Sequence, residues 1–364
     1  MHAAVAVFVA AAGFLSSCSA SSSGPGTNVA AAGVTGDTLT PTAVPAASIQ
    51  AADHDPFDGQ RALQILKAQC DFGVRPLGSD AHEKTKDYLI AQMKLFADET
   101  KLQQFTYRSM PVTNVIGVFY PAGGDHPAQQ PIVLMTHWDT RPIADGPFSA
   151  ETQRGVRFRY GPNGWSPTAP IMGANDAASG VAVMLELARM FKHKRPPVGV
   201  IMLLDDGEDY GDFTANNSQG DGVELGARYF AKNFRTDKTY GQPAYGILLD
   251  MVGAKNAFFL PEALSQSSAP NVNDRVFHIG QALGYADVFR STGSQSVGDD
   301  HVSMNDAGIP TIDIIHPLPG QGSPPGAYRY WHTREDTPDK CGAMTLKAVG
   351  DTIAETIYRE APSR

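Results

Sequence analysis

The sequence of 364 residues contains only three cysteines, no cluster of basic residues and no long apolar run. Without a Cys ligand motif, a zinc module held by thiolates is excluded. Without a Lys/Arg cluster, and with a net charge of -9, neither nucleic acid nor an anionic membrane surface is an expected partner. The apolar stretch at residues 3–15 is too short to span a bilayer comfortably.

The motifs of several enzyme classes are also missing. There is no P-loop, no Rossmann glycine fingerprint and no G-x-S-x-G elbow, which argues against nucleotide and serine-hydrolase chemistry. The composition, 42% hydrophobic and 18% charged, is that of a globular protein with a substantial core.

The first 55 residues predict export rather than structure. The apolar stretch precedes small residues, as in a secretory signal. Residues 15–18 (LSSC) resemble a bacterial lipobox, in which Cys18 carries a lipid anchor; simple secretion to the periplasm is the alternative, because no Lys or Arg precedes the stretch. Residues 19–55, rich in Ser, Gly, Ala, Thr and Pro, predict a disordered tether. We therefore expect a signal at 1–18, a tether at 19–55 and one folded domain at 56–364.

Cys70 and Cys341 are the cysteines of the folded domain. In an oxidising compartment they can form a disulfide that ties the first helical region to the last. Two separate buried thiols are the alternative, since the sequence does not give their separation.

Apolar runs alternate with helical patterns along the domain. Strands are expected at 114–120, 131–137, 198–204, 245–253 and 309–315, and helices at 59–69, 82–97, 180–191, 224–233, 273–283 and 345–358. In the third helix, Val181, Met184, Leu185 and Ala188 form a core-facing stripe. The nearly continuous apolar strands indicate an α/β three-layer sandwich, with a mixed, largely parallel sheet covered by helices on both faces.

Polar residues of metal-ligand type gather where these strands end. The stretch LDDGEDYGD at 204–212 places five carboxylates after a buried strand. In open α/β sheets, ligands bind beyond the carboxyl ends of the strands. Further side chains meet this rule at the ends of two other strands and at the start of a helix: His137, Asp139, Asp250 and Asp176.

Each residue alone also has a plain structural explanation. Asp176 can cap a helix, and His137 can be a hydrogen-bonded histidine at a strand end. Asp250 is different, because a carboxylate inside an apolar strand must be paired, protonated or bound to a cation. Asp205, Asp206 and Asp212 are expected to support the site or to face solvent.

Two C-terminal stretches add further candidates. YRYWHTREDTPD supplies His332 after Trp331, and SVGDDHVSMNDAGIP supplies Asp299, Asp300 and His301. Imidazole nitrogen and carboxylate oxygen together suit Zn²⁺, and three protein ligands with an open position are typical of a catalytic site.

The ordered set THWDT, GANDAASG, DDGEDYG, LLDMVG and WHT resembles the M28 family of zinc aminopeptidases over roughly residues 56–360. Within that superfamily, DDH followed by AGIPTIDII, together with the Trp before the last His, resembles the glutaminyl-peptide cyclotransferases, particularly the bacterial form.

The resemblance implies roles for particular residues. One zinc per chain would be held by Asp176, Asp209 and His332, in a catalytic domain acting on peptides with N-terminal glutamine. Glu208 would be the general base, with Asp250 and Asp300 hydrogen-bonded beside it and Trp331 lining the substrate pocket. Asp209 stands where the animal enzymes have Glu. Residues 147–171 lack a close match, and we expect them at the active-site rim.

Two alternatives stay open. A two-zinc aminopeptidase would add His137 and Asp250 to the ligands, with Asp176 as the bridge. A non-catalytic, exported metal-binding domain would bind zinc without turning over either substrate. The sequence does not specify the oligomeric state.

Overall fold

The computed structural model describes residues 50–126, 128, 130–213, 221–236 and 241–362. The predicted signal, Cys18 and residues 19–49 of the predicted tether lie outside the described residues. Residues 50–55 are described and lie against α9 (Ala343–Tyr358), where the Ala52 amide donates to the Glu355 carboxylate at 3.0 Å. Among the helices described, none is both long and apolar enough to cross a membrane.

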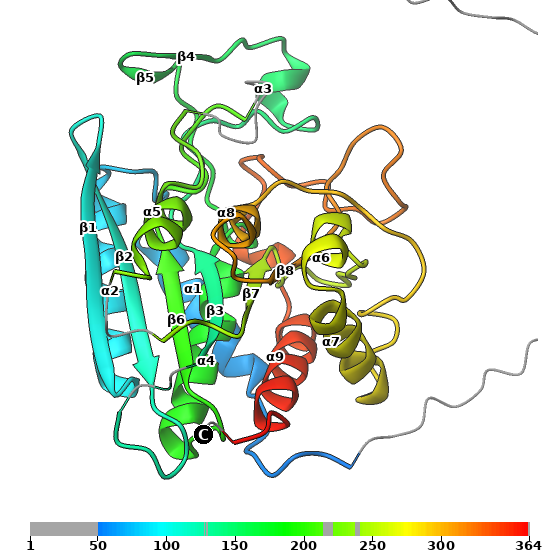
Figure 1. Cartoon of the computed structure of the whole chain (residues 1–364). Helices are drawn as coiled ribbons and strands as arrows, with labels where there is room; N and C mark the ends of the chain where they lie inside the picture. Colours follow the sequence, from blue (N-terminus) through cyan, green and yellow to red (C-terminus); the bar gives the residue numbers. More distant parts are fainter. Residues whose placement is uncertain (1–49, 127, 129, 214–220, 237–240, 363–364) are drawn as a thin grey trace, which may run out of the picture. The chain divides into compact units, whose positions relative to one another are not determined.

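Six strands form the central sheet in the order β1-β2-β6-β3-β7-β8. Four neighbouring strands are parallel, and β1 and β2 extend the sheet on one side as antiparallel strands (Figure 1). The strands are β1 (Glu99–Tyr107), β2 (Met110–Phe119), β3 (Ile132–His137), β6 (Val200–Asp205), β7 (Tyr245–Asp250) and β8 (Thr311–Ile315). The predicted mixed, largely parallel sheet is confirmed.

Helices cover both faces of this sheet. One face packs against α1 (Gly59–Asp71), α2 (Asp80–Phe96), α4 (Ala178–His193) and α9, and the other against α5 (Leu225–Asn233) and α8 (Asp300–Asp306). Beside β8 lie α6 (Ala263–Ser268) and α7 (Pro270–Ala282) (Figure 1). The remaining short elements are α3 (Ala150–Gln153), β4 (Arg159–Gly161), β5 (Gly164–Ser166) and the 3₁₀ turn η1 (Pro338–Lys340). The three-layer sandwich is therefore confirmed.

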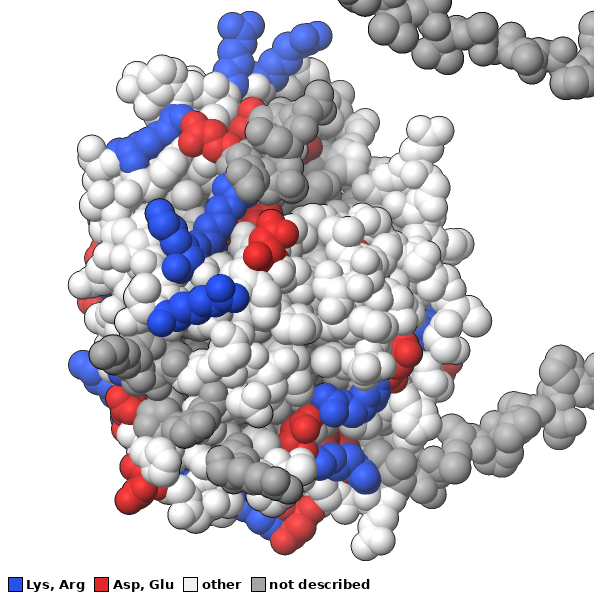
Figure 2. Space-filling model, viewed as in Figure 1, with Lys and Arg blue, Asp and Glu red and all other residues white. Residues whose placement is uncertain are grey.

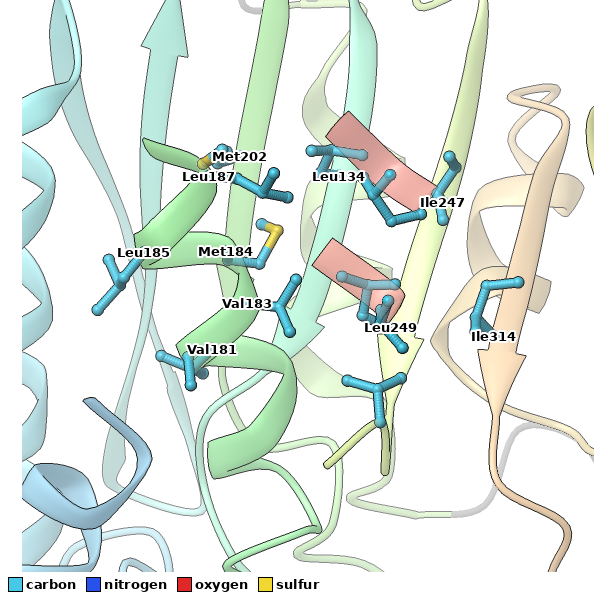
Figure 3. Packing of buried hydrophobic residues seen from close by; sticks show 14 of the residues in the cluster. Leu134, Val181, Val183, Met184, Leu185, Leu187, Met202, Ile247, Leu249 and Ile314 are labelled. Carbon is cyan, nitrogen blue, oxygen red and sulfur yellow. The ribbon is translucent and has the colours of Figure 1, made fainter. Parts of the chain in front are cut away.

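Helix α4 is buried almost all round rather than along one stripe. It packs between the sheet and the helices α1, α2 and α9. Val183, Met184 and Leu187 point toward the strands, while Val181 and Leu185 point to the other side (Figure 3). The predicted stripe is buried, but its neighbours are buried as well, because helices cover the side of α4 that faces away from the sheet.

All five predicted strands and all six predicted helices are present, with shifted ends. The sequence reading missed β1, whose side chains alternate between half-buried and exposed at the sheet edge. It also missed the short elements α3, β4, β5, α6 and α8, which have too few residues for an apolar period to register. Residues 147–171 contain α3 and the β4–β5 hairpin.

Cys70 and Cys341 are both buried and carry free thiols. Burial raises the pKa of Cys70 to about 11, so its thiol stays protonated at neutral pH. The structure thus has two separate buried thiols, the alternative to the predicted disulfide.

Charged side chains of both signs are interspersed on the face shown in Figure 2. Among the charged side chains of the described residues, Arg195 pairs with Asp98 at 2.6 Å. The absence of a nucleic-acid partner stays a prediction.

Candidate metal centre

The candidate ligands converge at one edge of the sheet because three adjacent parallel strands end there. His137 is the last residue of β3, Asp250 is the last residue of β7, and Asp209 lies in the loop that follows β6. Asp176 precedes α4, and His332 lies between β8 and α9. All five side chains are buried.

These side chains form two groups that share Asp176. The groups are His137, Asp176 and Asp250, and Asp176, Asp209 and His332; within each, ligand atoms lie within 4.8 Å of one another. Nε2 of His137 is 3.2 Å from Asp176 Oδ1 and 3.4 Å from Asp250 Oδ1. Nε2 of His332 is 3.2 Å from Asp209 Oδ1.

The donor set fits a zinc ion. Imidazole nitrogen with carboxylate oxygen suits Zn²⁺. In addition, Oδ2 of Asp209 and Oδ1 of Asp250 are buried without a hydrogen-bond partner in the described part of the chain. A buried carboxylate oxygen left without a donor is costly unless a cation compensates it.

Asp336 holds the loop that carries Asp176. Its buried carboxylate accepts the backbone N–H groups of Asn175 at 3.0 Å and Asp176 at 3.1 Å. Asn175 in turn accepts from the Gly253 amide at 2.8 Å, just beyond β7. These bonds connect the segment after His332 and the end of β7 to the start of α4.

Asp139 holds the next loop. Its Oδ1 accepts the amide of Glu208 at 3.1 Å, and its Oδ2 accepts the amide of Asp209 at 3.3 Å. One carboxylate therefore anchors both neighbouring acids at the end of β6. Nδ1 of His137 also lies 3.4 Å from Asp139 Oδ1, which orients the imidazole so that Nε2 faces Asp176 and Asp250.

His332 is oriented by Asp145. Its Nδ1 lies 3.0 Å from Asp145 Oδ1, and Asp145 also pairs with Arg141 at 2.7 Å. Burial opposes protonation of His332, but the carboxylates of Asp209 and Asp145 outweigh it and raise its pKa to about 9.

A cavity of about 400 Å³ opens beside both groups, since Asp176, Asp250 and His332 line it. Its apolar wall includes Trp331, whose ring stacks on His332 with centroids 3.9 Å apart. Its polar wall includes Glu208, Asp250 and Asp299, together with the two ligands Asp176 and His332. Burial raises the pKa of Glu208 well above its usual value, although the nearby His137 acts against this.

The structure places Asp299, rather than the predicted Asp300, on the cavity wall. Asp299 is the N-cap of α8, whereas Asp300 is the first residue of the helix and is turned toward Asp205. Burial raises the pKa of Asp205 to about 7 and the pKa of Asp300 well above its usual value. Sequence reasoning named Asp300 and not Asp299 as the acid beside Glu208, because the directions of the two side chains depend on the exact start of α8.

The remaining candidates fall behind the site. His301 lies 3.3 Å from Glu262, and both side chains are fully buried. Asp206 is buried and pairs with His82 at 2.8 Å. The predicted rim segment 147–171 contributes no residue to the cavity wall, but its Trp165 donates to the Tyr210 carbonyl at 2.7 Å, next to Asp209.

Sequence reasoning missed Arg141, Asp145 and Asp336. The first two lie four residues apart just after the THWDT motif, and the third lies four residues after His332. That proximity to predicted ligands was the available signal. Charged residues near motifs are common on surfaces, so burial was needed to single them out.

Several proteins of known structure resemble this chain in sequence and fold. The glutaminyl cyclase of Bacteroides thetaiotaomicron bound to N-acetylhistamine is 34% identical, with a TM-score of 0.72, over 85% of this chain and 100% of that chain. The glutaminyl cyclase of Porphyromonas gingivalis is 31% identical, with a TM-score of 0.70, over 82% and 97%. A leucine aminopeptidase precursor of B. thetaiotaomicron is 33% identical, with a TM-score of 0.71, over 85% and 99%.

An aminopeptidase of Bacillus subtilis strain 168, YwaD, is 24% identical over 263 residues, which are 71% of this chain and 46% of that protein. The chain thus matches about half the length of this curated relative. The model of peptidase family M28 matches residues 114–357, a range that includes all the candidate ligands. The chain therefore belongs to peptidase family M28.

Proposed function

We propose that this protein is a glutaminyl-peptide cyclotransferase, a zinc-dependent acyltransferase that converts the N-terminal glutamine of peptides and proteins to pyroglutamate and releases ammonia. The observation that carries the proposal is the cavity, which is lined by the indole of Trp331, stacked on the ligand His332, and by the acids Glu208 and Asp299. A flat apolar wall beside a metal ligand suits a short side chain with a polar end.

N-terminal glutamine supplies both reacting groups. Its α-amine is the nucleophile and its γ-amide is the electrophile, so the enzyme has to fold one chain end and stabilise the charge that develops. Asp176, Asp209 and His332 would hold one zinc ion. When bound, this ion supplies Lewis-acid polarisation of the γ-carbonyl oxygen.

Glu208 would carry the proton. As the α-nitrogen bonds to the γ-carbon, the Glu208 carboxylate takes a proton from the amine. It then gives this proton to the departing amide nitrogen as the old C–N bond breaks, which yields ammonia. Burial raises its pKa, and this is the direction of shift expected of a carboxyl group that both accepts and returns a proton.

Asp250 and Asp299 face the same cavity as Glu208. We propose that they accept hydrogen bonds from the substrate α-amine and keep the Glu208 proton in place. We propose this role for Asp299 in addition to Asp300, which stays a candidate because its carboxyl group is buried close to Glu208. The bacterial glutaminyl cyclases that are more than 30% identical to this chain support the proposal.

A two-zinc aminopeptidase is the second candidate. The group His137, Asp176 and Asp250 favours it, because Asp176 is shared with the other group as a bridging ligand would be. The similarity to an aminopeptidase and to a leucine aminopeptidase precursor also favours it.

Mass spectrometry of a short Gln-initiated peptide incubated with the purified domain tests the proposal, with and without a zinc chelator. A product lighter by one ammonia, with an intact chain and sensitivity to the chelator, supports the cyclase. Free glutamine and a peptide one residue shorter support the aminopeptidase instead. Zinc binding with neither product would indicate a non-catalytic metal-binding domain.

The proposal also covers the location of the protein. We propose that the protein is exported, either as a periplasmic protein or as a lipoprotein anchored at Cys18. Exported proteins with N-terminal glutamine would then be its substrates.

A further inference from the structure

Arg141 contacts the loop of one candidate ligand and the side-chain partner of another. Its Nη1 donates to the backbone carbonyl of Asp209 at 3.0 Å, to Asp209 Oδ1 at 3.2 Å and to the Gly211 carbonyl at 3.2 Å. The other side of the guanidinium pairs with Asp145 through Nε and Nη2, both at 2.7 Å.

Asp145 extends this contact to the second ligand. Its Oδ1 lies 3.0 Å from Nδ1 of His332, so the outer nitrogen of the imidazole is held and Nε2 faces Asp209. A hydrogen bond from the outer nitrogen of a ligating histidine to a carboxylate sets the orientation of the ring. Arg141 and Asp145 together thus connect Asp209 with His332, two residues 123 positions apart in the chain (332 minus 209).

Aromatic rings enclose the guanidinium. Arg141 is 1% exposed, with the Phe213 ring centroid 4.9 Å and the Trp165 ring centroid 5.5 Å from its Cζ. Trp165 belongs to the β4–β5 hairpin, which the sequence analysis could not match to the family. This burial strengthens the interaction of Arg141 with its partners by excluding water.

We propose that Arg141 and Asp145 are positioning residues, which set the distance and orientation between Asp209 and His332 before a metal ion binds. Asp209 is held at both its backbone carbonyl and its carboxylate. Its side chain therefore loses little conformational freedom when it binds zinc. Ligands held in advance by such supporting contacts bind metal more tightly. The inference rests on the metal centre and not on which reaction it supports.

Zinc affinity is the direct test. The dissociation constant is measured by competition with a chromophoric chelator for the wild-type protein, Arg141→Gln, Asp145→Asn and the double variant. Each single variant should raise the Kd about 10–100-fold, as loss of a supporting partner does in other metal sites. The double variant should bind zinc only slightly more weakly than the single variant with the higher Kd, because the two residues act as a unit.

The visible spectrum of the Co²⁺-substituted protein gives a second readout, since its bands report coordination geometry. We expect them to change in Arg141→Gln and Asp145→Asn. Arg141→Lys should not restore the wild-type Kd, because a Lys ammonium cannot reproduce the planar guanidinium that donates to Asp209 on one side and to Asp145 on the other. If Arg141→Gln does not fold, Asp145→Asn and Arg141→Lys carry the test.

Glu186→Gln is the matched control. Glu186 is fully buried and pairs with two arginines, Arg61 at 3.0 Å and Arg189 at 2.7 Å, away from the cavity. It should lower stability without changing the zinc Kd or the Co²⁺ spectrum. Wild-type values for both readouts in Arg141→Gln and Asp145→Asn would overturn the proposal. Neither readout uses substrate, so the absence of pyroglutamate formation would leave the result intact.

Discussion

Glu208 and Asp209 are neighbours in the chain, but their carboxylates lie in different surroundings. Asp209 is close to two cationic partners, with Arg141 and His332 each 3.2 Å from its Oδ1. Glu208 lines the cavity, and its Oε2 lies 3.8 Å from Nδ1 of His137. The first environment gives the Asp209 carboxylate charged partners, whereas in the second, burial raises the pKa of Glu208, which favours a group that exchanges a proton.

Replacement of Glu208 by Gln should separate metal binding from turnover. We expect zinc content to stay at the wild-type level while the rate of pyroglutamate formation falls about 10²–10⁴-fold, the usual contribution of a general acid–base group. Asp209→Asn is the comparison, because it should lose zinc as well as activity. An active Glu208→Gln variant would remove Glu208 from the mechanism.

Zinc binding should weaken as the pH falls. His332 has a raised pKa of about 9, so its imidazole is mostly protonated at neutral pH, and a metal ion must displace that proton. Below pH 9, protonation of His332 alone should raise the zinc Kd about tenfold for each unit by which the pH falls. Competition titrations between pH 6 and pH 8 measure the slope, and a flat profile would contradict the assignment of His332 as a ligand.

At the scale of elements, α4 packs unusually closely on the strands that end in ligands. A Cβ at Gly180 would lie 2.2 Å from Thr136 Oγ1 on β3 and 2.3 Å from the Leu249 carbonyl on β7. Glycine therefore allows the first turn of α4, which directly follows Asp176, to approach both strands.

Gly180→Ala should destabilise the protein although alanine favours helices. The gain in helix propensity is about 1 kcal/mol, whereas overpacking against backbone costs about 1–3 kcal/mol, and shifting α4 also moves Asp176. We expect a lower urea midpoint and a higher zinc Kd. Gly161→Ala is the control, because nothing lies within 4 Å of its added Cβ; equal midpoints for both variants would show that the close approach is unimportant.

At the scale of the whole molecule, three parallel strands and two distant loops bring two ligand groups together around Asp176. In each group a histidine nitrogen lies close to a carboxylate, at 3.2 Å between His332 and Asp209 and at 3.4 Å between His137 and Asp250. The other nitrogen of each histidine also lies near a carboxylate, Asp145 for His332 and Asp139 for His137. Both groups are therefore candidate metal sites.

Zinc content of the purified protein distinguishes the two candidate functions. We expect about one zinc per chain by elemental analysis, held by Asp176, Asp209 and His332, and about two would favour the aminopeptidase. Chelation should lower the melting temperature, since a ligand that binds only the folded state stabilises it. His137→Ala should retain the single zinc, and its loss in that variant would contradict the expected ligand set.

Local patterns were sufficient to predict much of this protein. Continuous apolar runs identify β2, β3, β6, β7 and β8, since strands covered by helices on both sides of the sheet need apolar side chains on both faces. Ligand types at strand ends predicted the edge where the site lies, because parallel strands present their carboxyl ends together. The order of the motifs indicated the family.

Only the tertiary structure decided which of two adjacent acids faces the cavity, that α4 is buried all round, and that Arg141, Asp145 and Asp336 hold the ligands. The physical reason is that the chemistry of a side chain follows from its residue type alone, whereas its direction and burial depend on contacts between distant segments. Asp299 and Asp300 have the same chemistry in the sequence, and the start of α8 against the sheet separates them.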